Sequence, residues 1–141
     1  KDPEILFATG RSDISVKFRE ILRDFWPRYV NVLQRYDDSI REVRIEGHTS
    51  SEWGSVSQDE SYFRNMALSQ SRTRSALQAC YMFTPADLLE WVRGNVTANG
   101  MSFSKLVIDE QGLEDVQQSR RVEFTIVTDS FTRLKEISEE L

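Results

Sequence analysis

Apolar residues recur along the chain with two different periods, and these periods predict its helices and strands. Between residues 16 and 36 they return every three or four positions, at Phe18, Ile21, Leu22, Phe25, Tyr29, Val32, Leu33 and Tyr36. This spacing predicts a long helix whose wide aromatic stripe faces a sheet. Pro27 lies inside the stripe. Because proline lacks a backbone N–H and clashes with the preceding turn, we expect a kink or a break there.

Short apolar runs predict strands at residues 4–8, 43–46, 106–108 and 121–127. The last run is the clearest, because Val122, Phe124 and Ile126 alternate with polar residues. Asn99-Gly100 has the composition of a turn.

Two further helices are expected. The first covers residues 65–83, where small residues would let the helix lie close to a sheet. The second covers residues 86–93, with Thr84 as its N-cap, Pro85 in its first turn, and Gly94 and Asn95 at its end.

The order of these elements predicts the architecture. Strand, helix, strand, helix, short helix, strand and strand follow one another, which is typical of an α+β two-layer sandwich. We expect a mixed sheet of about four strands with helices on one face. The length of 141 residues suits one domain, which we place at residues 1–128. Residues 129–141 would form a C-terminal amphipathic helical tail.

Composition narrows the class of protein. Hydrophobic residues make up 39% and charged residues 29%, which is a globular composition. A net charge of −5 argues against nucleic acid as a partner. No apolar run approaches the roughly 20 residues that cross a bilayer. The chain begins at Lys1-Asp2-Pro3, and we read it as a domain excised from a longer protein. Any membrane attachment would then come only through segments outside this chain.

The stretch that begins at residue 43 carries the candidate chemistry. A strand runs into Gly47-His48-Thr49, a polar loop follows at residues 50–61, and a helix begins near Asn65. Asn65 and Arg72 are about two helical turns apart and share nearly one face. A guanidinium can grip a carboxylate through two parallel hydrogen bonds, and Thr49 and Ser50 add hydroxyls. Such a cleft suits a small zwitterion.

These residues, in this order, carry a family resemblance. The chain resembles the OmpA C-terminal-like (OmpA/MotB) peptidoglycan-binding domain through Gly47-His48-Thr49, Asn65, Leu68-Ser69, Arg72 and Arg120-Arg121-Val122. The resemblance covers about residues 5–128 and implies the same fold. It also implies a pocket for the diaminopimelate of the peptidoglycan stem peptide, in which Arg72 clasps a carboxylate. The ligand-binding residues expected from it are Thr49, Ser50, Asn65, Leu68, Ser69, Arg72 and Arg121, the last chosen from the arginine pair.

One position departs from the family pattern. Ser50 stands where the family has an aspartate that clasps the ammonium end of the ligand. A hydroxyl lacks the charge assistance of an acid, so its hydrogen bond should be roughly half as strong. Glu52, Asp59 or Glu60 in the following loop could supply the lost carboxylate. The alternative is an OmpA-fold interaction or dimerisation module that has lost wall binding.

Several of these residues also have a purely structural interpretation. Arg72 could be an ordinary surface arginine, Asn65 could cap its helix, and Ser69 could bond to its own helix backbone. His48 fits a structural turn residue better than a ligand or a base. Trp53 is either a stacking surface or an anchor for its loop.

Catalysis and cofactors are not expected. A zinc hydrolase needs several histidine, cysteine or acidic ligands, and the chain has one histidine and one cysteine. The cysteine, Cys80, has small apolar neighbours that indicate a buried, inert thiol. The resemblance implies a periplasmic domain whose parent is attached to the inner or the outer membrane, with a MotB-like stator protein favoured. It also allows a homodimer.

Overall fold

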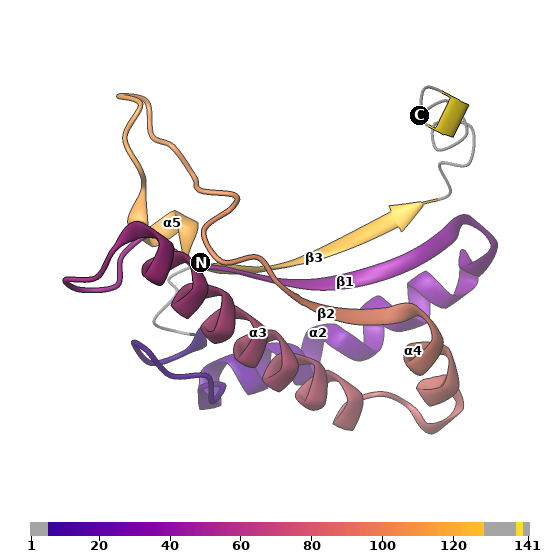
Figure 1. The fold of residues 1–141 in the computed structure, drawn as a ribbon. Coiled ribbons are helices and arrows are strands. Elements are labelled where there is room, and N and C mark those ends of the chain that lie inside the picture. Colours follow the sequence, from indigo (N-terminus) through magenta and orange to yellow (C-terminus); the bar gives the residue numbers. More distant parts are fainter. Residues whose placement is uncertain (1–5, 129–137, 140–141) are drawn as a thin grey trace.

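The structure, a computed structural model, describes residues 6–128 and residues 138 and 139. The elements, in chain order, are α2 (Val16–Arg35), η1 (Asp37–Ser39), β1 (Ile40–His48), α3 (Gln58–Met82), η2 (Ala86–Leu88), α4 (Leu89–Asn95), β2 (Val96–Gly100), α5 (Val116–Ser119) and β3 (Arg121–Thr128) (Figure 1). The predicted tail at residues 129–141 lies outside the described residues, apart from 138 and 139. Among the described helices, none is both long and apolar enough for a membrane span.

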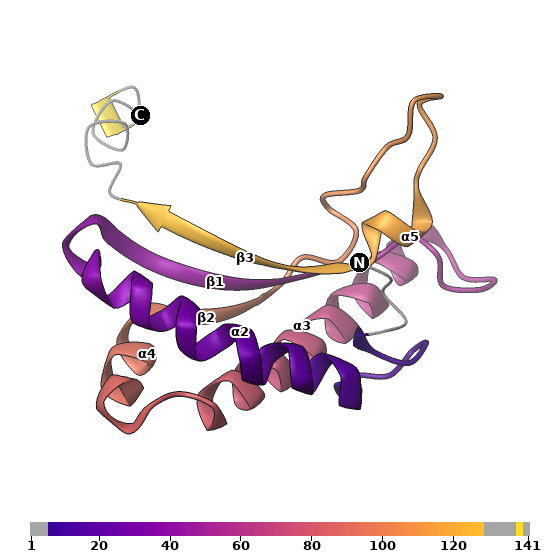
Figure 2. The ribbon, with the colours of Figure 1, turned by 180° about the vertical axis from the view of Figure 1, so that it is seen from behind.

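The sheet has the order β2-β1-β3 and is mixed. β1 pairs with β2 in parallel and with β3 antiparallel. Helices α2, α3 and α4 lie on one side of this sheet (Figures 1 and 2). The predicted α+β architecture, with helices on one face of a mixed sheet, is therefore confirmed, with three described strands where about four were expected.

The core forms where α2 meets the helix-facing side of β1. Ser15 caps α2 by accepting a hydrogen bond from the Phe18 N–H over 3.0 Å. The stripe then buries Phe18, Leu22, Trp26, Val30 and Leu33 against residues that include Val43 and Ile45. α2 continues through Pro27, so of the two predicted outcomes the break does not occur, and the kink stays a prediction. Two completely buried side chains, those of Trp26 and Val30, flank the proline and hold both turns against the core.

The strand next to β1 is not the one the sequence predicted. β2 runs from Val96 to Gly100, and Gly100 is the register partner of Gly47. A strand at residues 106–108 and a turn at Asn99-Gly100 were expected, and both predictions are wrong. In residues 106–108 the pairing is one isolated bridge, between Ile108 and Glu114. Gly100 is a glycine because a Cβ there would lie 2.5 Å from the backbone nitrogen of Gln70.

The predicted first strand at residues 4–8 lies partly outside the described residues. Within it, Phe7 forms an isolated antiparallel bridge with Ile14.

Thr84 does not cap the short helix as predicted. Its Oγ1 accepts a hydrogen bond from Trp26 Nε1 over 2.9 Å and donates to the carbonyl of Cys80 over 2.8 Å. The threonine therefore provides the acceptor that the buried indole needs, and the short helix follows as η2 and α4. Cys80 is buried as predicted. Burial raises the pKa of its thiol to about 12, which agrees with an inert thiol.

α3 packs on the sheet through a column of small polar side chains. Ser61, Asn65, Ser69 and Thr73 follow one another at four-residue steps, and all four are buried. The helix is longer than predicted, because Ser57 caps it by accepting from the Glu60 N–H over 3.1 Å. Asn65 is therefore two turns inside the helix, and the interpretation of Asn65 as an N-cap is wrong.

Candidate functional site

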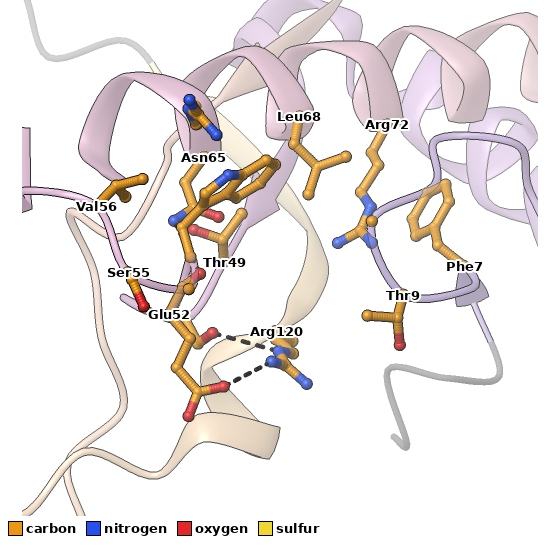
Figure 3. A pocket seen from close by; sticks show the side chains of 15 residues that line it. Phe7, Thr9, Thr49, Glu52, Ser55, Val56, Asn65, Leu68, Arg72 and Arg120 are labelled. Atoms are coloured by element: carbon orange, nitrogen blue, oxygen red, sulfur yellow. Dashed lines mark hydrogen bonds and ion pairs between the residues drawn. The ribbon is translucent and has the colours of Figure 1, made fainter. Parts of the chain in front are cut away.

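A cavity of about 530 Å³ opens where the end of β1, the first half of α3 and the residue before β3 meet (Figure 3). Five of the seven predicted ligand-binding residues line it, namely Thr49, Ser50, Asn65, Leu68 and Arg72. The loop between β1 and α3 forms one wall, and the segment around Phe7 forms another. The fold thus gathers side chains from four separate parts of the chain around one space.

Arg72 is held in place by backbone carbonyls. Its Nε donates to the carbonyl of Arg11 over 2.8 Å, and its Nη2 donates to that of Ala8 over 3.3 Å. The guanidinium carbon lies 4.9 Å from the centre of the Phe7 ring, which is cation–π distance. No carboxylate among the described residues forms an ion pair with Arg72. The side chain is therefore oriented, and its charge has no described counter-ion.

The charge of Arg72 persists at neutral pH. Burial, with a smaller contribution from repulsion by Arg120, lowers the pKa of Arg72 to about 10. This value is still well above 7, so the guanidinium is cationic. An anion bound beside it would offset both effects, because a nearby opposite charge favours the charged form of the guanidinium.

Arg120 and Glu52 form a charged pair at the cavity, across from Arg72 in Figure 3. Arg120 Nε donates to Ser50 Oγ over 3.3 Å, and Nη2 pairs with Glu52 Oε2 over 3.0 Å. The Glu52 side chain remains 60% exposed. Of the three loop acids proposed to replace the family aspartate, Glu52 is the one that lines the cavity. Glu60 instead pairs with Arg64, and Asp59 lies in the first turn of α3.

Arg121, expected in the site, lies outside this cavity. It begins β3, pairs with Glu123 through its Nε over 2.6 Å, and donates to the carbonyl of Ser119 over 3.1 Å. Arg120, its neighbour in the pair, lines the cavity in its place. Adjacent residues of an extended chain point to opposite sides, and the motif alone does not say which of the two faces the site.

Ser69 is also outside the cavity lining, and its role is structural. Its Oγ donates to the carbonyl of Met66 over 2.9 Å and accepts from the Ser102 N–H over 3.1 Å. The first bond is the helix-backbone bond that the alternative interpretation expected. The second bond fixes Ser102, whose φ of 50° is unusual for a residue other than glycine.

Asn65 and Thr49 shape the floor of the cavity. Asn65 Nδ2 donates to the carbonyl of Glu52 over 3.4 Å and to Ser61 Oγ over 3.3 Å, which ties the loop to α3. Thr49 is anchored by its backbone N–H, which donates to the carbonyl of Ser102 over 2.9 Å. Its Oγ1 is buried and has no hydrogen-bond partner among the described residues. That hydroxyl is therefore unsatisfied and closed off from solvent.

Comparison with known proteins finds a protein of similar sequence and no matching protein-family model. The chain is 44% identical over 142 residues to the Zorya protein ZorB of Escherichia coli, and the match covers 99% of this chain and 60% of that protein. The chain thus spans well under two thirds of the length of that relative.

Two solved structures resemble the fold closely enough to define it. The periplasmic domain of Helicobacter pylori MotB (residues 97–256) matches with a TM-score of 0.61 at 15% identity, covering 100% of this chain and 88% of that one. The chain has the OmpA/MotB fold. The peptidoglycan-associated lipoprotein of Burkholderia pseudomallei matches with a TM-score of 0.55 at 16% identity, covering 87% of this chain and 88% of that one.

Some residues of the cavity were not predicted from the sequence. Phe7 reaches the site from a segment outside the family motifs, and Arg120 belongs to the arginine pair from which Arg121 was chosen. Glu114 supports the loop from further away, because its carboxylate accepts from the N–H and the Oγ of Ser51 over 3.0 and 2.5 Å. Trp53 lines the cavity wall; whether it stacks on a ligand stays a prediction.

A second and larger cavity lies elsewhere in the fold, beside the C-terminal half of α3, α4 and the start of β2. Its volume is about 950 Å³. Arg93, one of its lining cations, already donates to the Tyr81 hydroxyl. None of the motif residues lines this space, so the smaller cavity is the candidate site.

Proposed function

We propose that this domain binds peptidoglycan without catalysis and anchors its parent protein to the cell wall. Its ligand would be the diaminopimelate of the stem peptide, held in the cavity that Arg72 lines. The observation that carries the proposal is the state of Arg72, which is oriented by two carbonyls, faces a cavity and has no described counter-ion. A carboxylate is the group that best satisfies such a guanidinium.

The two ends of a zwitterionic ligand would find different partners. Its carboxylate would meet Arg72 at the wall of the cavity. Its ammonium would meet the exposed carboxylate of Glu52, which compensates for the serine at position 50. Glu52 would then exchange part of its contact with Arg120 for the ligand. Glu52 thereby takes the role that the family gives to its aspartate.

The comparisons support a wall-anchoring role. The Burkholderia protein with this fold is named a peptidoglycan-associated lipoprotein, and the MotB structure is of a periplasmic domain. By the same reasoning we place this domain in the periplasm, on a parent held in a membrane by segments outside residues 1–141. The wall-binding unit would be residues 1–128, with residues 129–141 as an appended tail.

The cavity suits a binding module better than an enzyme. The single histidine, His48, and the single cysteine, Cys80, are both absent from its lining. Nucleophilic catalysis requires a base within hydrogen-bonding reach of the nucleophile. The serine and threonine hydroxyls of the cavity therefore lack an imidazole to activate them.

Arg72→Ala tests the proposal directly. Loss of one charge-assisted hydrogen bond costs about 1.5–3 kcal/mol, so we expect binding of a diaminopimelate stem peptide to weaken at least about 10- to 100-fold. Titration calorimetry gives the affinity, and sedimentation with purified sacculi gives retention on the wall. The control is Arg74→Ala, two residues further along α3, exposed, and turned roughly 200° away from Arg72. Equal affinities for wild type and Arg72→Ala would refute the proposed site.

Glu52→Gln tests the ammonium end of the ligand. We expect weaker binding of the same peptide, because the amide cannot pair with an ammonium, while Glu60→Gln on the neighbouring turn leaves affinity unchanged. A stem peptide with lysine in place of diaminopimelate lacks the second carboxylate. It should bind wild type as weakly as diaminopimelate binds Arg72→Ala.

A second function is favoured by one observation. Ser50 replaces the family aspartate, and its Oγ is already engaged by Arg120. The domain would then be a protein-interaction or dimerisation module without wall binding. Failure of the wild-type protein to sediment with sacculi, together with a dimer in analytical ultracentrifugation, would favour this function over the first.

A further inference from the structure

We propose that Glu46, His48 and Glu123 form a binding site for a divalent transition-metal ion of the zinc class. The site lies on the sheet face opposite the helices. None of its three residues lines the 530 Å³ cavity described above, although His48 and Arg72 both line a much smaller one. Glu46 and His48 are two residues apart on β1, so their side chains share one face. Glu123 on β3 is the register partner of Glu46. Gly47 between them faces α3, since a Cβ there would touch Thr73.

The state of His48 is the first observation. The residue is only 4% exposed, and neither ring nitrogen has a hydrogen-bond partner among the described residues. Buried polar groups in native proteins are almost always bonded, and each exception requires a reason. Leaving such a group unsatisfied costs about 1–3 kcal/mol. A bound cation would remove that cost.

The direction in which His48 points is the second observation. Its Nε2 lies 3.5 Å from Glu46 Oε1 and 3.8 Å from Glu123 Oε2. Both separations are too long for a good hydrogen bond, which is usually about 2.9 Å. They are close to the spacing of donor atoms around a metal. Zinc bonds of about 2.0–2.2 Å in a tetrahedron place the ligand atoms roughly 3.3–3.6 Å apart.

The three donor atoms already form a compact set. All lie within 4.8 Å of one another, so a small movement of the exposed Glu123 side chain would complete the geometry. Burial, followed by repulsion from Arg121, lowers the pKa of His48. Glu123 has a side chain that is 46% exposed, which leaves a route for the ion and room for a water ligand.

Neighbouring residues orient these ligands. Thr125 Oγ1 donates to Glu46 Oε1 over 3.1 Å, and Arg121 Nε pairs with Glu123 Oε1 over 2.6 Å. Such outer contacts are typical of metal ligands. Oε2 of Glu123 remains directed at the imidazole. Glu46 and Glu123 bring two carboxylates to the imidazole. Two arginines lie near these acids, and each is already paired: Arg121 with Glu123, and Arg44 with Glu42. An imidazole with carboxylates favours zinc and similar ions over calcium or magnesium, which prefer oxygen ligands alone.

Titration of the metal-free 141-residue protein with zinc chloride tests the proposal. We expect one zinc per chain in calorimetry, and a visible absorption band of low-coordinate Co²⁺ when cobalt is the probe. His48→Gln and Glu123→Gln should each weaken binding by more than about 10-fold. Glu42→Gln, a glutamate on the same strand outside the cluster, should leave it unchanged. Arg72→Ala should also leave it unchanged, which separates this site from the wall-binding site.

Two results would overturn the metal site. One is the absence of stoichiometric zinc binding by the wild-type protein. The other is equal affinity in wild type, Glu123→Gln and Glu42→Gln, which would indicate an adventitious ion only. If His48→Gln fails to fold, Glu123→Gln decides, because its side chain is about half exposed and its loss leaves the core intact.

Discussion

Gly47, the first residue of the Gly-His-Thr motif, provides the sharpest test of how the site is positioned. A Cβ at this position would lie 2.7 Å from Thr73 Cγ2 and 3.0 Å from the Ser69 carbonyl oxygen. Both contacts are on α3, the helix that carries Arg72. Gly47→Ala therefore forces the strand and the helix apart, and overpacking of this kind costs about 1–3 kcal/mol.

The structure also identifies the change that should rescue this variant. Thr73→Ser removes the methyl group that causes the shorter contact, and alone it should cost about 0.8 kcal/mol for the lost burial of one carbon. In the Gly47→Ala/Thr73→Ser double variant the 2.7 Å contact is absent. Only the contact with Ser69 then remains. The double variant should therefore be more stable than the sum of the two single losses by about 1 kcal/mol.

Urea unfolding, followed by tryptophan fluorescence, measures all four proteins of this cycle. The same four proteins can be titrated with stem peptide, since displacement of α3 would move Arg72. Strict additivity of the two losses in unfolding free energy would refute the reasoning. It would mean that the methyl group of Thr73 is not what excludes a side chain at Gly47.

Four further predictions concern other positions. Gly100→Ala should destabilise the protein by more than 1 kcal/mol or so, because a Cβ there meets backbone of α3. Gly94→Ala should instead stabilise the protein by about 0.5–1 kcal/mol, because Gly94 is in a helix and a Cβ there would meet no other atom. Equal changes in unfolding free energy for the two variants, measured with urea, would contradict both predictions. Thr84→Val leaves the buried Trp26 N–H without its acceptor and should cost about 1–3 kcal/mol in the same assay, and a cost near zero would rule out that role. Burial raises the pKa of the Cys80 thiol to about 12, so iodoacetamide at pH 8 should label it only after unfolding, and rapid labelling of the native protein would disprove this.

The sequence predicted the helices and strands whose pattern of apolar and polar residues depends only on which face of that element is buried. α2 has an apolar stripe at helical spacing, and β3 alternates apolar and polar residues along its length. Each pattern reflects burial against a face, which recurs with the period of the element. These elements were therefore predictable without knowing their partners.

β2 was not predicted, because the residue types in it are determined by contact with a neighbouring helix and not by the strand itself. Asn99 and Gly100 have the composition of a turn, yet Gly100 is small because the backbone of α3 runs beside it. The apolar run at residues 106–108 has the composition of a strand but lies in the segment between β2 and α5. Local composition does not distinguish a glycine needed for a turn from one needed for close approach.

The site was predictable to a similar extent. Arg72, Asn65 and Thr49 follow from one short motif, and all three line the cavity. Arg120 could not be separated from Arg121, because the choice depends on how the chain enters β3. The carbonyls of Ala8 and Arg11 that orient Arg72 belong to residues more than 60 positions away in the sequence. Contacts between residues so far apart produce no periodic pattern in the sequence, so they could not be predicted from it.

The buried polar column of α3 also fixes the helix along its own axis. Leucine and valine side chains can repack if a helix shifts, but Asn65 and Ser69 each require particular partners on the loop and on Ser102. A shift by one residue would turn the helix about 100° and move it about 1.5 Å. Arg72 would then leave the carbonyls that hold it. The column therefore fixes the rotation of α3 about its own axis. This rotation in turn determines the direction in which the Arg72 side chain points.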